Sequence, residues 1–416
     1  MRNLIRYMYQ RDEYESGEKM QVNIERLDSF GRGISFVNGK VCFIENAMPK
    51  EIVDIKITKE KKKYSEAIVL NYIKEDENRQ YKCPHQNLCG GCDILHLPLE
   101  LQRNFKREKI KNVLNLEDIE LVQNNVDFYR NKTIFHIDHQ KLGFYQKKSN
   151  TVIPIDECLL LDTHINSLIE TLKEVVVDNE CSEAMVRIGN KTNEVMISIT
   201  GKISLENIER LQKKCDVLYI NNQLKTKKSQ IKSIIGDKEY LISKDSFFQI
   251  NPFITEKLYD YIKELIKDNQ GKNVLDLYCG AGTIGIYISD IVDQVIGIEI
   301  SESSINDARK NKLLNKVENI DFYHGDVKKY TDMIKSSIDT IIIDPPRAGV
   351  SKEVIDKLLK MKTKNIIYVS CDLYTLKRDL DLLTTEYNIE QVKAFDMFFN
   401  THHVECVALM SRKESE

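Results

Sequence analysis

Hydrophobic positions, in part alternating with polar ones, mark four short stretches of residues 17–73. The stretches are MQVNIERL, GISFVNGKVCFIEN, IVDIKITKEK and SEAIVLNYI, and Gly31, Gly33, Gly39 and Pro49 lie in the turns. Period-two alternation bounded by glycine and proline is typical of β-strands. Several short strands in so small a segment predict an OB-like β-barrel, and such barrels commonly bind nucleic acid.

The pattern changes after this barrel. Leu97, Leu101, Phe105, Ile110 and Val113 recur at helical spacing and predict an amphipathic helix. Residues 125–235 contain β-rich pieces such as NKTIFHID, KLGFYQ and NEVMISIT, which indicate a mixed α+β segment.

From about residue 250 onward, apolar runs alternate with amphipathic helical patterns. The predicted strands are NVLDLYC, QVIGIEI, NIDFYHG, TIIIDPP, NIIYVSC, IEQVKAFDMF and HVECVALM. This alternation predicts an α/β domain with a parallel, Rossmann-like sheet and an antiparallel strand near its end. We therefore divide the chain into a barrel at 14–75, a central domain at 76–235 and an α/β domain at 236–416. The segment 95–120 is a candidate to pack on the last of these.

Composition narrows the class of protein. The chain has 416 residues, 42% hydrophobic and 30% charged, with a net charge of -3. It has no apolar run long enough to span a membrane, and its start does not resemble a signal peptide, so we expect a cytoplasmic protein. Ten cysteines in a reducing compartment favour metal binding, catalysis or plain burial over disulfides. Local lysine clusters at 59–63 and 225–232 are typical of a solvated face, and the cluster at 59–63 is also a candidate for phosphate contact.

A glycine-rich turn follows the first strand of the α/β domain. In VLDLYCGAGTIGIYI, Gly280, Gly282 and Gly285 fit the spacing G-x-G-x-x-G. The next strand ends in Glu299, which can accept hydrogen bonds from ribose hydroxyls, and the third ends in Asp326, which can receive an adenine amine. The pattern indicates an adenosine-containing cofactor, either NAD or S-adenosylmethionine.

The sequence DPPR, from Asp344 to Arg347, separates these cofactors. Dinucleotide dehydrogenases do not need it, whereas methyltransferases often place an acidic-Pro-Pro turn beside the transferred methyl group and the target base. Enzymes that methylate exocyclic amines usually follow Pro-Pro with an aromatic residue. Arg347 stands there instead, which points away from amine substrates.

A cysteine closes the fifth strand of the α/β domain, in IIYVSCDLYTLKRDL. Uracil C5 is too weak a nucleophile to attack a sulfonium methyl group unless a thiolate first adds to C6. Cys371 is the candidate thiolate, and a helix beginning just after it would lower its pKa. Glu405, His402 and His403 are the candidate general bases.

Five motifs in this order resemble the signature of the RNA uracil-5 methyltransferase family. They are SFFQIN, LDLYCGAGT, DPPRAG, VSCDLYTLKRDL and MFFNTHHVE. Residues 17–73 resemble the TRAM domain that precedes catalysis in many members, among them the 23S rRNA enzymes and their tRNA relatives. The resemblance implies a Rossmann-like methyltransferase fold and S-adenosylmethionine as cofactor.

The resemblance also implies roles for single residues. Cys371 matches the nucleophile, and Glu405 matches the base that removes the C5 proton. The matched cofactor contacts are Gln249, Tyr278, Thr283, Glu299, Asp326 and Asp344. This chain departs from the usual pattern at Leu373 and Phe399, where many members have proline.

A second cysteine group lies in CPHQNLCGGC, where Cys83, Cys89 and Cys92 are spaced C-x5-C-x2-C. A closed site needs a fourth ligand. Cys158 is one candidate, and His85 or His96 could complete a zinc site. The spacing of these cysteines fits zinc and a [4Fe–4S] cluster about equally well. The family resemblance favours the iron–sulfur cluster, held by Cys83, Cys89, Cys92 and Cys158.

Together these features predict an S-adenosylmethionine-dependent enzyme that methylates uracil C5 in 23S rRNA. No obligate protein partner is evident in the sequence. A tRNA uracil-5 methyltransferase remains an alternative, as does a non-catalytic RNA-binding protein. A small-molecule dehydrogenase is disfavoured by DPPR and the barrel. Which uridine is modified, and in which oligomeric state, is not encoded in these patterns.

Overall fold

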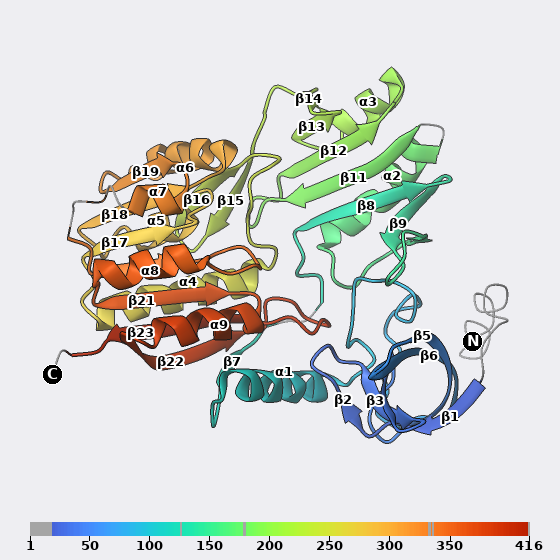
Figure 1. The fold of residues 1–416 in the computed structure, drawn as a ribbon. Helices are drawn as coiled ribbons and strands as arrows, with labels where there is room; N and C mark the ends of the chain where they lie inside the picture. The colour runs from blue at the N-terminus through green and yellow to red at the C-terminus, as the bar shows by residue number, and fades with distance from the viewer. Residues whose placement is uncertain (1–18, 125–126, 178–179, 332–333, 335–336, 415–416) are drawn as a thin grey trace. The chain divides into compact units, whose positions relative to one another are not determined.

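The computed structural model describes residues 19–124, 127–177, 180–331, 334 and 337–414. The chain forms two compact units (Figure 1). The first unit comprises the described residues of 1–109, 144–153 and 400–402, and the second comprises those of 110–143, 154–399 and 403–416. None of the helices in these ranges combines the length and apolar character needed to cross a bilayer.

A small barrel makes up most of the first unit (Figure 1). Its strands are β1 (Lys19–Asn23), β2 (Arg26–Leu27), β3 (Gly33–Val37), β4 (Lys40–Glu45), β5 (Ile52–Glu60) and β6 (Tyr64–Lys74), in the order β1-β5-β6-β4-β3-β2. Cys42, Ile44, Val53 and Ile55 are fully buried in its core. These residues alternate with less buried ones, Phe43 in β4 and Asp54 in β5, as expected for strands that turn one face toward the core.

The long helix α1 (Leu99–Leu114) follows the barrel, and from Ile110 onward it belongs to the second unit. The central sheet has the order β10-β9-β8-β11-β12-β13-β14. Its strands are β8 (Lys132–Asp138), β9 (Lys141–Tyr145), β10 (Val152–Pro154), β11 (Cys181–Ile188), β12 (Val195–Gly201), β13 (Val217–Ile220) and β14 (Gln223–Leu224), with helices α2 (Thr163–Val177) and α3 (Leu205–Gln212). A separate hairpin, β15 (Ile231–Ile235) and β16 (Lys238–Ile242), follows.

An eight-stranded sheet forms the centre of the α/β domain, in the order β19-β18-β17-β20-β21-β23-β22-β7. Its strands are β7 (Leu121–Val122), β17 (Asn273–Leu277), β18 (Gln294–Glu299), β19 (Ile320–His324), β20 (Thr340–Ile343), β21 (Asn365–Ser370), β22 (Tyr387–Phe395) and β23 (Glu405–Arg412). Only β23 runs antiparallel to its neighbours in this described sheet. Its place between β21 and β22 confirms the predicted antiparallel strand.

Helices α4 (Pro252–Asp268), α5 (Thr283–Ile288), α6 (Glu302–Leu314), α7 (Val327–Tyr330), α8 (Lys352–Met361) and α9 (Leu373–Leu383) connect these strands. Several begin at a side chain that caps the free backbone N–H groups of the first turn. Asn251 accepts from Ile254 N at the start of α4, and Asp372 accepts from Tyr374 N and Thr375 N at the start of α9. Such caps fix where a helix begins, and each contributes about 1 kcal/mol.

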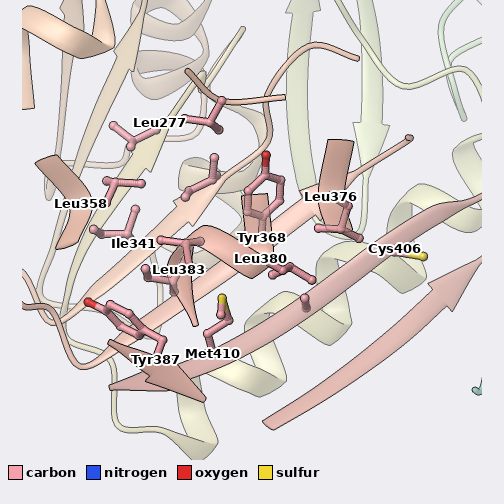
Figure 2. Close-up of a cluster of buried hydrophobic side chains, with 14 of the residues drawn as sticks. Leu277, Ile341, Leu358, Tyr368, Leu376, Leu380, Leu383, Tyr387, Cys406 and Met410 are labelled. Atoms are coloured by element: carbon pink, nitrogen blue, oxygen red, sulfur yellow. The ribbon is translucent and has the colours of Figure 1, made fainter. Parts of the chain in front are cut away.

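One face of this sheet buries an apolar cluster, part of which Figure 2 shows. Leu277, Ile341 and Tyr368 project from the strands toward Leu358 of α8 and Leu376, Leu380 and Leu383 of α9. Ile110 and Leu114 of α1 join the same cluster, whereas the residues of α1 up to Lys109 belong to the first unit. Truncating one of these leucines to alanine typically costs about 2–5 kcal/mol, so the cluster holds the strand ends in register.

Candidate active site

Cys371 follows the carboxyl end of the parallel strand β21, and Glu405 begins the antiparallel strand β23, so both predicted catalytic residues lie at the same edge of the sheet. β21 pairs with β23 in a register that joins Ser370 to Cys406. One step further in that register sets Cys371 opposite Glu405, the first residue of β23. Ligands bind at these strand ends in open α/β sheets, so the nucleophile and base candidates share the expected edge.

Burial dominates the chemistry of Cys371. It raises the pKa of this thiol to about 11, and the carboxylates of Glu405 and Asp344 raise it further. Arg347 opposes this shift through its positive charge and through the hydrogen bond that its guanidinium donates to the sulfur. The lowered pKa expected from the following helix is therefore wrong for the protein without RNA: desolvation outweighs the helix terminus. The thiol must lose its proton as it attacks.

Two carboxyl groups face this thiol. Glu405 is 3% exposed, and burial followed by the charge of Asp344 raises its pKa well above the usual value, against the opposing charge of Arg347. Burial raises the pKa of Asp344 to about 7. Two neighbouring carboxyls resist double ionisation, so the site holds a proton near neutral pH and gains from a bound cation.

Helix α9 fixes the loop that carries Arg347. Thr375 Oγ1 donates to the Arg347 carbonyl at 3.1 Å, and Arg378 Nη2 donates to the Ala348 carbonyl at 3.0 Å. The buried carboxylate of Asp379 accepts from Val350 N at 2.8 Å and from the Tyr368 hydroxyl at 2.6 Å. Because α9 begins two residues after Cys371, one helix sets the positions of both the thiol and its hydrogen-bond donor.

The glycine turn between β17 and α5 leaves room for a bound molecule to approach its backbone closely. Gly280 has φ +55, and a Cβ there would meet nothing within 4 Å, so its outer side opens to free space. Gly282 has φ +75, and a Cβ there would clash with the Phe322 ring. Tyr278, at the end of β17, also adopts a positive φ of 63, which is strained for a bulky residue and is typical of functional sites.

A recess opens beside this turn and is lined by Gln249, Tyr278, Thr283 and Asp344, among others. Four of the predicted cofactor contacts therefore meet in one place. Thr283 Oγ1 shares a hydrogen bond with the Tyr259 hydroxyl at 2.8 Å. The segment carrying Gln249 is tied down by Asn251, whose amide donates to the Met397 carbonyl at 3.2 Å.

The other two predicted contacts lie at neighbouring strand ends. The Glu299 carboxylate accepts from Gly280 N at 3.1 Å and from Ser301 N at 2.7 Å, which fixes it at the turn. Asp326 is exposed and caps α7 by accepting from Lys328 N at 2.9 Å. Its role as the N-cap of α7 is therefore one reason for an aspartate at this position.

Asp276 is a site residue that the sequence reasoning missed. It is 1% exposed and lines the recess, and among the described residues its Oδ1 has no hydrogen-bond partner, while Oδ2 accepts from Gly285 N. Burial, then the charge of Asp344, raises its pKa to about 8. The sequence carries a signal for this residue: a carboxylate inside the apolar strand NVLDL needs a hydrogen-bonding or charged partner, which marks Asp276 as a candidate site residue.

We expect the affinity for S-adenosylmethionine to rise between about pH 6 and pH 9, because Asp276 must be ionised to attract a cation. Its raised pKa means that the carboxyl is protonated below about 8, and binding must then expel the proton. The loss is at most about tenfold per pH unit for one group. Calorimetric titration at several pH values measures the slope.

The Asp276→Asn variant should bind the cofactor more weakly and with a flatter pH profile. Asp356→Asn is the matched control, because its carboxylate is exposed on α8 and belongs to no proposed cofactor contact. A wild-type affinity that is independent of pH would contradict this role for Asp276.

His402 and His403 differ from Glu405 in their surroundings. His402 lies in the first unit, where its Nδ1 lies 2.6 Å from Asp93 Oδ2. His403 packs edge-on against Phe398. Glu405 is the candidate base whose charge acts directly on Cys371.

The first unit holds Cys83, Cys89 and Cys92, all partly exposed, and the second holds Cys158. Cys89 Sγ accepts a hydrogen bond from Gly91 N at 3.4 Å, and Cys83 Sγ accepts one from the backbone of His85. N–H donors aimed at sulfur suit thiolate ligands. In the described part of the chain, no three His, Cys, Asp or Glu side chains are grouped closely enough to hold a metal ion.

Comparisons with known proteins agree with this geometry. The chain matches the family model described as tRNA (Uracil-5-)-methyltransferase over residues 99–413, and that of the TRAM domain over residues 14–70. An uncharacterized RNA methyltransferase from Bacillus cereus is 32% identical, with 96% of this chain and 98% of that protein covered. One from Aquifex aeolicus is 33% identical, with 95% and 99% covered.

A solved structure also resembles the whole chain. It is the tRNA (uracil-54, C5)-methyltransferase of Pyrococcus abyssi in complex with S-adenosyl-L-homocysteine, with a TM-score of 0.79 and 27% identity. The likeness covers 94% of this chain and 100% of that one.

Proposed function

This chain belongs to the tRNA (uracil-5-)-methyltransferase family of S-adenosylmethionine-dependent RNA methyltransferases, and we propose that it methylates C5 of a uridine in 23S rRNA. The observation that carries the chemistry is the register that sets Cys371 opposite Glu405 at the open edge of the sheet. The TRAM barrel together with the cysteine-rich segment supports a ribosomal substrate. We further infer a cytoplasmic location, where ribosomal RNA is found.

Cys371 opens the proposed reaction. The thiol gives up its proton to water as Sγ bonds to C6 of the uracil, and the electrons of the C5–C6 double bond move toward C5 and O4. Arg347 stabilises the developing thiolate through the hydrogen bond that it donates to the sulfur. S-adenosylmethionine supplies the methyl group as an electrophilic carbon on sulfur, and C5 takes this methyl group as that carbon–sulfur bond breaks.

Glu405 closes it. Its carboxylate removes the C5 proton, the C–H electrons re-form the C5–C6 double bond, and Sγ leaves C6 as a thiolate. Glu405 must be ionised for this step although burial favours its protonated form. A cation bound beside Asp344 lowers that cost, so cofactor binding prepares the base.

The cofactor is assigned to the recess and its neighbouring strand ends. We propose that Glu299 binds the ribose hydroxyls and Asp326 the adenine amine. The remaining contacts are assigned to Gln249, Tyr278, Thr283, Asp344 and Asp276. The open side of Gly280 and the unpartnered Asp276 oxygen support this fit.

A tRNA substrate is the second candidate. The observation that favours it is the likeness to the Pyrococcus abyssi enzyme, which is named for uracil-54 of tRNA and matches nearly the whole chain. The chemistry at Cys371 and Glu405 is the same for both substrates. A non-catalytic RNA-binding role is disfavoured because both residues are in place at the same strand ends.

The deciding experiment uses transcripts of 23S rRNA and tRNA that carry tritium at uridine C5. The enzyme and S-adenosylmethionine should release tritium to water from the 23S transcript. Release from the tRNA transcript alone would establish the second candidate. Absence of release from either, with S-adenosylmethionine bound, would overturn the proposed chemistry.

We also propose a [4Fe–4S] cluster on Cys83, Cys89, Cys92 and Cys158. The spacing of the first three and the N–H donors at two of the sulfurs support thiolate ligands. Methyl transfer moves no electron, so the residues around the cluster would serve folding or RNA binding. Zinc is the alternative occupant of the same thiols.

Protein purified without oxygen should contain about four iron and four sulfide per chain if this cluster is present. Cys83→Ser and Cys158→Ser should each lose most of that iron. Cys181→Ser is the matched control, since this partly exposed thiol starts β11 and lies outside the proposed ligand set. Stoichiometric zinc without sulfide would assign the site to zinc.

A further inference from the structure

Two cations face each other across neighbouring strands of the second unit. β8 and β11 are antiparallel, and their register pairs Lys132 directly with Arg187. Like charges at directly opposed positions destabilise a sheet, because their side chains project from the same face. The charges of Asp307 and Asp245 act on Arg187, but neither carboxylate forms an ion pair with Lys132, so an anion bound beside Lys132 relieves the repulsion further.

Arg187 is already committed to the protein. It is 2% exposed, and its guanidinium donates to the Ser243 carbonyl at 3.1 Å and to the Ser246 carbonyl at 2.9 Å. Its hydrogen bonds therefore stabilise the loop that leads to the recess. Lys132, its neighbour across the strands, has the free ammonium of the pair.

No carboxylate of the described chain forms an ion pair with Lys132, which is only partly buried. Asp245, the acidic side chain of the nearby loop, is paired with Lys244. Burial lowers the pKa of Lys132 to about 8, and the charges of Arg187, Arg130 and Lys244 lower it as well, against the opposing charge of Asp245. The ammonium therefore lies among cations and remains accessible to a ligand.

The backbone that carries Lys132 is anchored to the segment that lines the recess. The residue before it, Asn131, donates from its backbone to the Ile250 carbonyl at 3.0 Å and from its side chain to the Gln249 carbonyl at 3.2 Å. The same segment carries Phe247, which is 65% exposed at the rim of the recess. Lys132 therefore follows directly after Asn131, whose two hydrogen bonds hold the segment that lines the recess.

We infer that Lys132 binds an RNA phosphodiester next to the target uridine. This inference rests on the proposed function. A nucleotide that leaves its stack to enter an active-site recess carries its flanking phosphates to the rim, where a fixed cation can neutralise one of them. The unpaired ammonium beside Arg187 supplies that charge, and the phosphate relieves the repulsion between the two cations.

The test compares Lys132→Gln, Lys132→Arg and Lys173→Gln. Lys173 is the charge-matched control because it lies on α2 and pairs with Asp156. Fluorescence anisotropy with the 23S rRNA and tRNA transcripts at several salt concentrations gives the affinity and its salt slope. Calorimetry with S-adenosylmethionine reports on the recess.

Lys132→Gln should weaken RNA binding about tenfold at low salt and reduce the slope of log affinity against log salt by about 0.7–0.9. Lys132→Arg should restore both, and Lys173→Gln should leave both unchanged. The glutamine variant should also melt no lower than the wild type, because it removes a like-charge neighbour.

An unchanged salt slope, or a loss of S-adenosylmethionine affinity with normal RNA binding, would overturn the phosphate site. This outcome is distinct from failure of the proposed function. A wild-type enzyme that binds RNA but releases no tritium would refute uracil methylation, while the effect of Lys132 on binding would still be measured.

Discussion

The Cys371→Ala enzyme should release no tritium from its RNA substrate, a loss on the order of 10⁴-fold or more. The cause is specific: without the sulfur, C6 receives no nucleophile and C5 never gains the electrons that it needs to take a methyl group. The side chain lies at a strand end and is only partly buried, so its truncation leaves the apolar cluster intact. Tritium release under single-turnover conditions measures the effect.

Two controls separate chemistry from structure. S-adenosylmethionine affinity of Cys371→Ala should equal that of the wild type, because the thiol does not line the recess. Cys215→Ser, which alters a thiol beside α3, should retain full activity. Appreciable release by Cys371→Ala would remove this residue from the mechanism.

We expect the second large effect from the Glu405→Gln enzyme. This variant should stop the reaction after the covalent bond to RNA has formed, whereas Cys371→Ala should prevent that bond. Addition of Cys371 and methyl transfer remain possible, but the C5 proton has no acceptor, so the thiol cannot leave. We expect a covalent protein–RNA adduct to accumulate, with the methyl group already transferred. Denaturing gels with labelled RNA detect it, and turnover should fall by at least about 10²-fold.

Glutamine keeps the size of this buried side chain and removes its ionisable group. The double variant Cys371→Ala/Glu405→Gln should form no adduct, since the bond to C6 requires the sulfur. His403→Gln is the matched control among the other candidate bases and should turn over normally. Normal turnover by Glu405→Gln together with adduct formation by His403→Gln would reassign the base.

Local patterns determined much of this protein. Period-two alternation predicted the barrel, and alternation of apolar runs with amphipathic segments predicted the α/β sheet with its reversed strand. These signals are readable because the backbone period decides which side chains share a face. The glycine turn and the position of Cys371 at a strand exit are equally local, since they depend on a few consecutive residues.

Tertiary structure decided the rest. β7 pairs with β22 although the paired residues Leu121 and Ala394 are 273 positions apart, and the two residues of β7 carry no distinctive pattern. The pKa of Cys371 could not be read from the helix that follows it, because burial and two carboxyls contributed by distant strands outweigh that helix. The electrostatic surroundings of Asp276 and Lys132 are likewise set by residues distant in the sequence.

The sequence alone therefore specified the elements, the order of the motifs and the types of reacting groups. Only the folded chain determined which charges meet: Cys371 with Glu405, Asp276 with Asp344, and Lys132 with Arg187. The physical reason is that strand register and burial are set by contacts distant in sequence. The free energy of a buried charge depends on those neighbours rather than on adjacent residues.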